Sequence, residues 1–221
     1  MRILAIDTST KFFCLALYDR NRACTYRLEA GRGLSKIIAL TIKRILDARD
    51  LEAKDIDYFA CAQGPGSFTG LRIGMATLKA MAWSADKPAV GIPSLDILAE
   101  NAQADKFTTV VPVIDAKRGL IYASAYKNKK RILPYLLCSI KELSRKIKGA
   151  PLFLGDALGI YKDEILDNFK NAGLLDADHW FPEPENVLAL AARKIKANKI
   201  TDAFRIKPLY IYPKECQIKK A

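Results

Sequence analysis

Residues 62–74, AQGPGSFTGLRIG, decide how the neighbouring chain folds, because four of these thirteen positions are glycine. The stretch follows residues 56–63, IDYFACAQ, an apolar run typical of a buried strand. It leads into residues 68–83, which have the length and composition of a helix, with Ser67 or Thr69 as the N-cap. We therefore predict a βα unit with a tight glycine turn.

The glycine turn differs from both common phosphate-binding loops. A P-loop needs lysine and a hydroxyl residue after its second glycine, but Leu71 and Arg72 follow Gly70. A dinucleotide-binding fingerprint needs a third glycine at position 69, where the chain has Thr69. Gly70 and Gly74 lie four residues apart, on one face of the predicted helix. These small residues predict close helix packing, either inside the subunit or against another protein.

A second predicted helix, residues 34–46, has apolar side chains around more than half of its circumference. Such a helix needs two neighbours, of which one is its own sheet and the other is either its own domain or another protein. With the glycine helix it predicts a partner interface with Phe68 and Arg72 at the rim. The candidate interface residues are Leu34, Ile38, Ile42, Ile45, Phe68, Gly70, Leu71, Arg72, Gly74, Met75 and Leu78.

The order of the predicted elements is similar in the two halves of the chain. The first half adds strands at 2–7, 12–18, 23–28 and 89–92 and a helix at 95–103. The second half has strands at 108–115, 120–127, 131–138 and 151–155 and helices at 139–147, 160–170 and 185–197. Both begin with three strands, then a helix and a further strand. This order predicts a duplicated α/β architecture with subdomains 1–105 and 106–221.

Composition places the chain among globular proteins of the cytoplasm. Half of its 221 residues are hydrophobic, yet no apolar run approaches the length that spans a bilayer, so we expect no membrane contact. The five cysteines form no CxxC pair, which favours free thiols.

The net charge is +12: residues 1–105 hold 14 Lys and Arg against 12 acidic residues, and residues 106–221 hold 22 against 12. The basic second half indicates either an anionic partner such as RNA or a solvated basic surface.

Catalytic side chains are scarce. The single histidine, His179, excludes a paired-imidazole metal site, and no GxSxG motif presents a nucleophile, so we predict neither catalytic residues nor a bound metal. Asp7 ends the first strand and could hold magnesium through water, while the hydroxyl residues Thr8, Ser9 and Thr10 contact phosphate. Alternatively, Asp7 only caps the turn. Asp115, at the end of the corresponding strand in the second half, would complete such a site.

Five segments in chain order, ILAIDTST, AQGPGSFTGLRIG, GIPSLDILA, VIDAKRGLIYASAY and PLYIYPK, resemble the TsaB (YeaZ) family. The resemblance implies an α/β fold of the actin-like ATPase (ASKHA) type, with two ribonuclease-H-like subdomains. It also implies a non-catalytic partner of the TsaD transferase, which forms N6-threonylcarbamoyladenosine at position 37 of tRNA. The first subdomain would pair with TsaD, or with a second copy of this chain, through helices that form a bundle.

Further expectations follow from this resemblance. A TsaE-type ATPase would join the assembled complex, and tRNA would be its substrate. The isolated chain would bind no cofactor, and ATP with magnesium would bind only in the complex, which leaves Asp7, Thr8, Ser9, Thr10 and Asp115 as a vestigial nucleotide site. Two alternatives remain open: an autonomous ATP-dependent kinase or ATPase of the same fold, and a stand-alone tRNA-binding protein.

Overall fold

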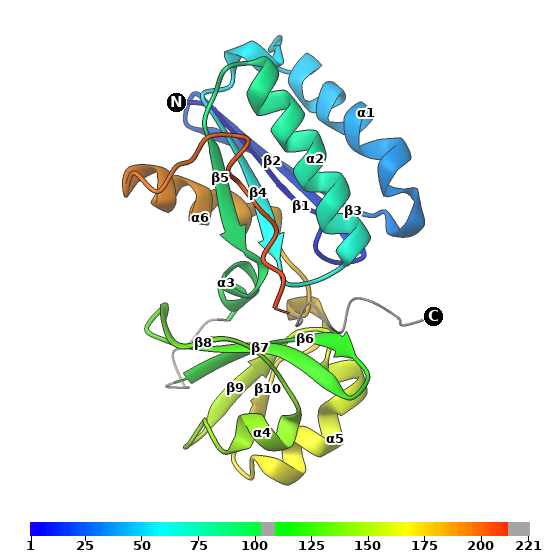
Figure 1. Ribbon diagram of the computed structural model, residues 1–221, viewed down its shortest axis with the longest axis vertical. Coiled ribbons are helices and arrows are strands. Elements are labelled where there is room, and N and C mark those ends of the chain that lie inside the picture. Colours follow the sequence, from blue (N-terminus) through cyan, green and yellow to red (C-terminus); the bar gives the residue numbers. More distant parts are fainter. Residues whose placement is uncertain (103–108, 212–221) are drawn as a thin grey trace. The chain divides into compact units, whose positions relative to one another are not determined.

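The computed structural model describes residues 1–102 and 109–211, and the chain divides into two compact units. Unit 1 combines Met1–Ile97 with Pro182–Pro208, so the chain returns to it after building unit 2 from Leu98–Phe181 and the residues after Pro208. Each unit contains one five-stranded sheet. Figure 1 shows the elements of both units with their labels.

The sheet of unit 1 has the strand order β3-β2-β1-β4-β5. Strands β1 (Ile3–Asp7), β2 (Phe12–Asp19) and β3 (Arg22–Glu29) form an antiparallel meander. Strands β4 (Tyr58–Gly64) and β5 (Ala89–Pro93) then run parallel to β1. The three central strands are almost entirely buried on both faces, which explains their continuous apolar sequence.

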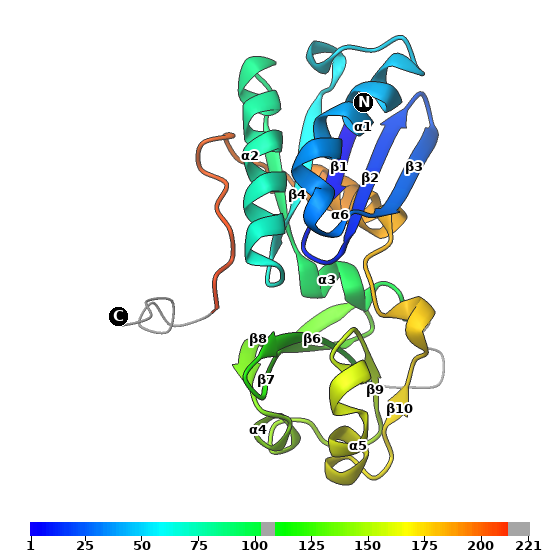
Figure 2. The same cartoon turned by 90° about the vertical axis from the view of Figure 1, so that its right-hand side faces the viewer.

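Helices cover both faces of this sheet (Figures 1 and 2). On one face, α1 (Leu34–Asp47) and α2 (Phe68–Ser84) pack over Leu4, Ile6 and Leu15. On the other face, α6 (Pro184–Lys196) packs over Ile3, Ala5 and Ala16. Shorter helical segments complete unit 1 and the passage to unit 2: η1 (Gly31–Gly33), η2 (Ala53–Asp55) and α3 (Ser94–Ala99). Alternate residues of β1 thus contact opposite layers, as strand geometry requires.

Unit 2 repeats this topology with the strand order β10-β9-β6-β7-β8. Strands β6 (Thr109–Lys117), β7 (Leu120–Lys127) and β8 (Lys130–Cys138) are antiparallel, and β9 (Pro151–Leu154) and β10 (Gly173–Leu174) run parallel to β6. Helices α4 (Ile140–Ser144) and α5 (Leu158–Asn168) share one hydrophobic cluster with β6 and β9, and η3 (Ala177–His179) follows β10. The predicted duplicated α/β architecture is confirmed, and the structure adds that each three-strand meander is extended by two parallel strands.

The structure differs from the sequence-based expectations in three respects. The helices predicted at 95–103 and 139–147 are shorter, and the two-residue strand β10 was missed. The border predicted between residues 105 and 106 lies outside the described residues. Residues 182–208, predicted as part of the second subdomain, belong to unit 1, because the apolar face of α6 packs on the sheet of unit 1.

Within the described chain, no helix combines the length and the apolar composition that crossing a membrane requires.

Candidate functional site

The glycine face of α2 lies against the turn that follows β1. A Cβ atom added at Gly70 would lie 2.1 Å from the carbonyl oxygen of Thr8, and one at Gly74 would lie 2.1 Å from Thr8 Oγ1. A Cβ at Gly66 would approach the carbonyl oxygen of Ser9 to 2.3 Å, and that same oxygen accepts a hydrogen bond from Ser67 N at 2.7 Å. These contacts match the internal alternative of the close packing predicted for Gly70 and Gly74, because the turn after β1 fills the space beside them.

Asp7 is held inside this turn. Its Oδ1 accepts a hydrogen bond from Ser9 N at 2.6 Å, whereas Oδ2 has no hydrogen-bond partner among the described residues. Burial raises the pKa of the Asp7 carboxyl to about 6. Asp7, Thr8 and Ser9 are each at most 2% exposed, and Thr10 Oγ1 accepts from Phe12 N. Asp7, Thr8 and Ser9 are thus enclosed by the packing of unit 1, while Thr10 is partly exposed, and the vestigial nucleotide site stays a prediction.

The second predicted carboxylate, Asp115, lies in unit 2 and has partners of its own. Its carboxylate accepts a hydrogen bond from Lys117 N at 2.8 Å and forms an ion pair with Lys117 Nζ. Its backbone N donates to Asp156 Oδ1 at 3.0 Å, and burial raises the pKa of Asp156. Asp7 belongs to unit 1 and Asp115 to unit 2. Across the described residues, no group of three or more His, Cys, Asp and Glu side chains is arranged to hold a metal ion.

Asp156 was missed in the sequence, although its position offered a signal. It follows β9, which runs parallel to β6 and pairs with it, so the carboxyl ends of these two strands lie side by side. The duplicated order of elements would have placed Asp156 near Asp115 if it had been applied to strand ends.

The predicted interface residues separate into two groups. Phe68 and Arg72 are exposed, and the guanidinium of Arg72 stacks 3.8 Å from the Phe68 ring centroid. The other nine are buried within unit 1: Leu34, Ile38, Ile42, Ile45, Gly70, Leu71, Gly74, Met75 and Leu78. The sequence-based prediction assigned the apolar residues of the amphipathic helices to the partner interface. In an amphipathic helix, these are the residues that contact its own sheet.

A shallow hollow of about 400 Å³, here called the α1–α2 groove, lies along the two helices. Its lining is mainly apolar: Ala39, Ile42, Lys43, Leu46, Asp47, Leu51, Glu52, Ala53, Thr77, Ala80 and Met81. On α1, beside the groove lining, Leu40 is 49% exposed. Lys43 Nζ pairs with the Asp47 carboxylate at 2.7 Å on the groove's edge. Of the predicted interface residues, only Ile42 lines this groove.

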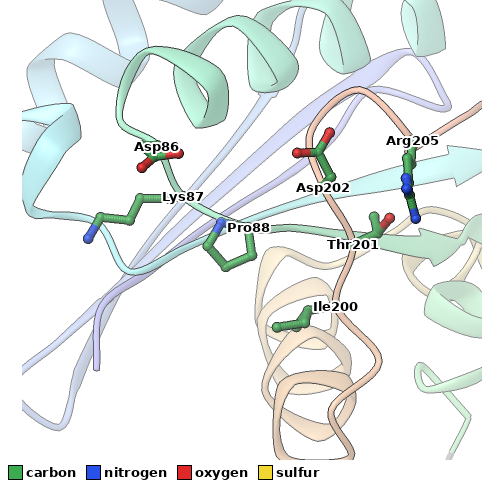
Figure 3. A pocket seen from close by; sticks show the side chains of 7 residues that line it. All are labelled: Asp86, Lys87, Pro88, Ile200, Thr201, Asp202 and Arg205. Carbon is green, nitrogen blue, oxygen red and sulfur yellow. The ribbon is translucent and has the colours of Figure 1, made fainter.

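A second hollow of about 440 Å³ lies beyond the C-terminal end of α2 (Figure 3). It is lined by Asp86, Lys87, Pro88, Ile200, Thr201, Asp202 and Arg205, so its charged groups are two carboxylates and two cations. Two backbone hydrogen bonds between Ala89 and Thr201 join its two sides. Mixed charges on an open surface favour contacts with a polar macromolecule over enclosure of a small ligand.

Comparisons with known proteins agree with this architecture. A family model described as TsaD, tRNA N6-adenosine threonylcarbamoyltransferase, matches residues 28–150. The tRNA threonylcarbamoyladenosine biosynthesis protein TsaB of Bacillus subtilis is 29% identical over 99% of this chain and 97% of its own length.

Two solved structures agree in fold. YeaZ from Pseudomonas aeruginosa superposes with a TM-score of 0.82 at 24% identity, covering 95% of this chain and 99% of that one. An inorganic polyphosphate/ATP-glucomannokinase from Arthrobacter reaches a TM-score of 0.51 at 14% identity, over 89% of this chain and 99% of that one. The predicted actin-like ATPase (ASKHA) fold with two ribonuclease-H-like halves is thus confirmed.

Proposed function

The chain belongs to the TsaB (YeaZ) family, and from this premise we propose that it takes part in forming N6-threonylcarbamoyladenosine at position 37 of tRNA. Its role in this pathway is that of a non-catalytic partner which binds a TsaD-type transferase. The cytoplasm is where we expect it to act. A TsaE-type ATPase and the tRNA substrate join the assembled complex, and a homodimer is the alternative state when the transferase is absent.

The single observation that carries this proposal is the α1–α2 groove on the outer face of unit 1. The groove is shallow and its lining is mostly apolar, and small residues such as Ala39 and Ala80 let a second helix approach closely. Leu40 lies on α1 outside the lining of the groove and is 49% exposed, so burial of the exposed half of its side chain would stabilise a complex by about 0.7–1.5 kcal/mol. Such a surface suits a protein partner better than a small substrate.

The kind of partner follows from the family model. The match to the transferase family covers residues 28–150, which includes both α1 and α2. A transferase of that family is expected to carry equivalent helices. Two related helix pairs can pack through the same surface on each protein and bury both apolar grooves in one bundle.

We propose that this chain is not catalytic because the turn that holds Asp7 is buried. A catalytic carboxylate must reach a substrate or its metal, but Asp7 is 1% exposed and its turn is packed against α2. The alternative of an autonomous kinase or ATPase would require this turn to open. We expect titration calorimetry of the isolated chain with ATP and magnesium to show no binding heat, and we propose that any nucleotide is held only in the complex.

The docking proposal is tested with Ala80→Arg, which places a bulky charge in the α1–α2 groove. The matched control is Ala189→Arg, because Ala189 is also an exposed helical alanine but lies on α6, across the sheet. We expect Ala80→Arg to weaken binding of the transferase at least tenfold in titration calorimetry, with binding by Ala189→Arg unchanged. Equal affinity of the two variants would reject the groove as the docking surface.

A further inference from the structure

Two aromatic side chains lie together on the surface of unit 1. Trp83, in the last turn of α2, is 65% exposed, and Phe204, which follows α6, is 64% exposed. Their ring centroids are 6.0 Å apart, in an edge-to-face arrangement. Together they present aromatic surface that the fold of the unit does not use for its core.

The segment that carries Phe204 is firmly attached. Lys79 Nζ, from α2, donates hydrogen bonds to the carbonyl oxygens of Phe204 and Ile206, both at 3.2 Å. Gln63 Nε2 donates to the carbonyl oxygen of Lys207 at 3.0 Å. Ile206 is buried in the core of unit 1, together with Ala203. The backbone around Phe204 is therefore fixed while its ring remains at the surface.

The same segment is strongly basic. Residues 193–207 contain six Lys and Arg, against Asp202 alone. Five of these cations are exposed: Arg193, Lys196, Lys199, Arg205 and Lys207. Because residues 182–208 belong to unit 1, this part of the basic charge counted in the second half of the sequence lies on unit 1. Charge and aromatic surface thus occur on one segment.

Figure 3 shows the charged neighbours of this segment at the end of α2. Lys87 and Arg205 line the hollow there, together with Asp86 and Asp202. Asp202 Oδ1 already accepts a hydrogen bond from Phe204 N at 2.7 Å, which occupies part of its acceptor capacity. Within residues 193–207 the carboxylate of Asp202 offsets one of the six positive charges, so the segment keeps a net positive charge.

We propose that Trp83, Phe204 and the exposed cations of residues 193–207, together called the Trp83–Phe204 surface, bind single-stranded RNA. Unpaired bases stack on the two rings, and Lys199 and Arg205 contact the neighbouring phosphates. Aromatic platforms flanked by cations are the general means of binding single strands, because every base has a stacking face and every phosphate a charge. The centre of a protein interface is instead depleted in lysine.

This surface lies outside the lining of the α1–α2 groove, so the inference goes beyond the proposed docking of the transferase. The tRNA substrate enters only as the natural source of an unpaired loop. Failure of transferase binding would leave the RNA proposal standing, and the reverse also holds. The two proposals therefore have separate tests.

The test uses the purified full chain and its tryptophan fluorescence, with a short oligouridylate and an RNA duplex as probes. We expect the oligouridylate to quench the fluorescence in the wild type but not in Trp83→Phe. Contact with about three phosphates would give a slope of about −2 for log K against log salt. The duplex is expected to leave Trp83 unquenched, because its bases are already stacked.

Variants identify the residues. Phe204→Ala should weaken oligouridylate binding at least about fivefold, the lower range for loss of one stacked base. The double change Lys199→Glu with Arg205→Glu should weaken it at least tenfold. Lys162→Glu, an exposed lysine of α5 in unit 2, serves as the charge control and should bind as the wild type does. Unchanged thermal unfolding shows that each variant is folded.

Several outcomes would overturn the proposal. One is the absence of quenching at low salt; another is an equal loss of binding in Lys162→Glu, which would indicate nonspecific charge attraction. If quenching by the oligouridylate is absent and the transferase also shields Trp83 from acrylamide, the surface is a protein contact.

Discussion

Thr8 occupies the space that any side chain at position 74 would need, since a Cβ atom on Gly74 would lie 2.1 Å from Thr8 Oγ1. This contact joins the turn after β1 to the middle of α2. The glycine residues thus serve the internal packing of unit 1. They let the helix lie directly over the turn that holds Asp7, and the protein surface begins on the opposite side of the helix.

Gly74→Ala tests this contact. We expect a loss of about 1–2 kcal/mol in the free energy of unfolding: overpacking costs about 1–3 kcal/mol, and the helix propensity of alanine returns up to about 1 kcal/mol. Urea unfolding measures the change. Gly33→Ala is the control, because a Cβ at Gly33 would meet no atom within 4 Å. If Gly74→Ala were as stable as the wild type, the predicted clash would be relieved by a small backbone shift.

Asp7→Asn tests the charge buried in the turn. Because burial raises the folded-state pKa from 3.8 to about 6, the native state holds more protons than the unfolded state in that window. Stability therefore falls as pH rises from about 4 to 6, and the full cost, about 3 kcal/mol, applies above the folded-state pKa. We expect Asp7→Asn to unfold at higher urea concentration than the wild type at pH 8 and to differ little at pH 4. A variant that is less stable at pH 8 would mean that the carboxylate charge has a favourable partner.

Lys79→Met tests how the segment after α6 is attached. The substitution keeps much of the apolar stem of the side chain but removes both hydrogen bonds to the carbonyl oxygens of Phe204 and Ile206. A hydrogen bond from a charged donor contributes about 1.5–3 kcal/mol when well formed, and less where solvent screens it. We expect faster hydrogen exchange at residues 203–207, with unchanged exchange in β1 and β4. The same exchange rates in both proteins would show that Ala203 and Ile206 hold the segment without Lys79.

The sequence predicted the local elements well and their surroundings less well. Continuous apolar runs predict the strands β1 and β4. The length and pattern of the apolar segments predict the helices α1 and α2. By contrast, the pattern of α6 shows that one face is apolar but does not say which sheet it covers, so its return to unit 1 needed the structure. Tertiary contacts, which a single sequence does not contain, decide such questions.

The candidate site shows the same limit. Large apolar residues such as Ile38 and Met75 were chosen for the interface, yet they fill the core. The α1–α2 groove is lined in part by smaller residues, including Ala39 and Ala80, which hydrophobic patterns do not distinguish from ordinary surface. Small glycine residues were also ambiguous, because close packing inside a subunit and between subunits requires the same sequence feature.

The central claim, that this chain is a docking partner for a transferase of its own family, is tested most directly by light scattering of each purified protein and of their mixture. We predict a defined heterocomplex with the wild-type chain and its loss with Leu40→Arg, which changes an exposed residue of α1 without entering the core. Thermal unfolding of the variant provides the folding control. A mixture that scatters as two separate proteins, under conditions in which both are folded, would contradict the claim.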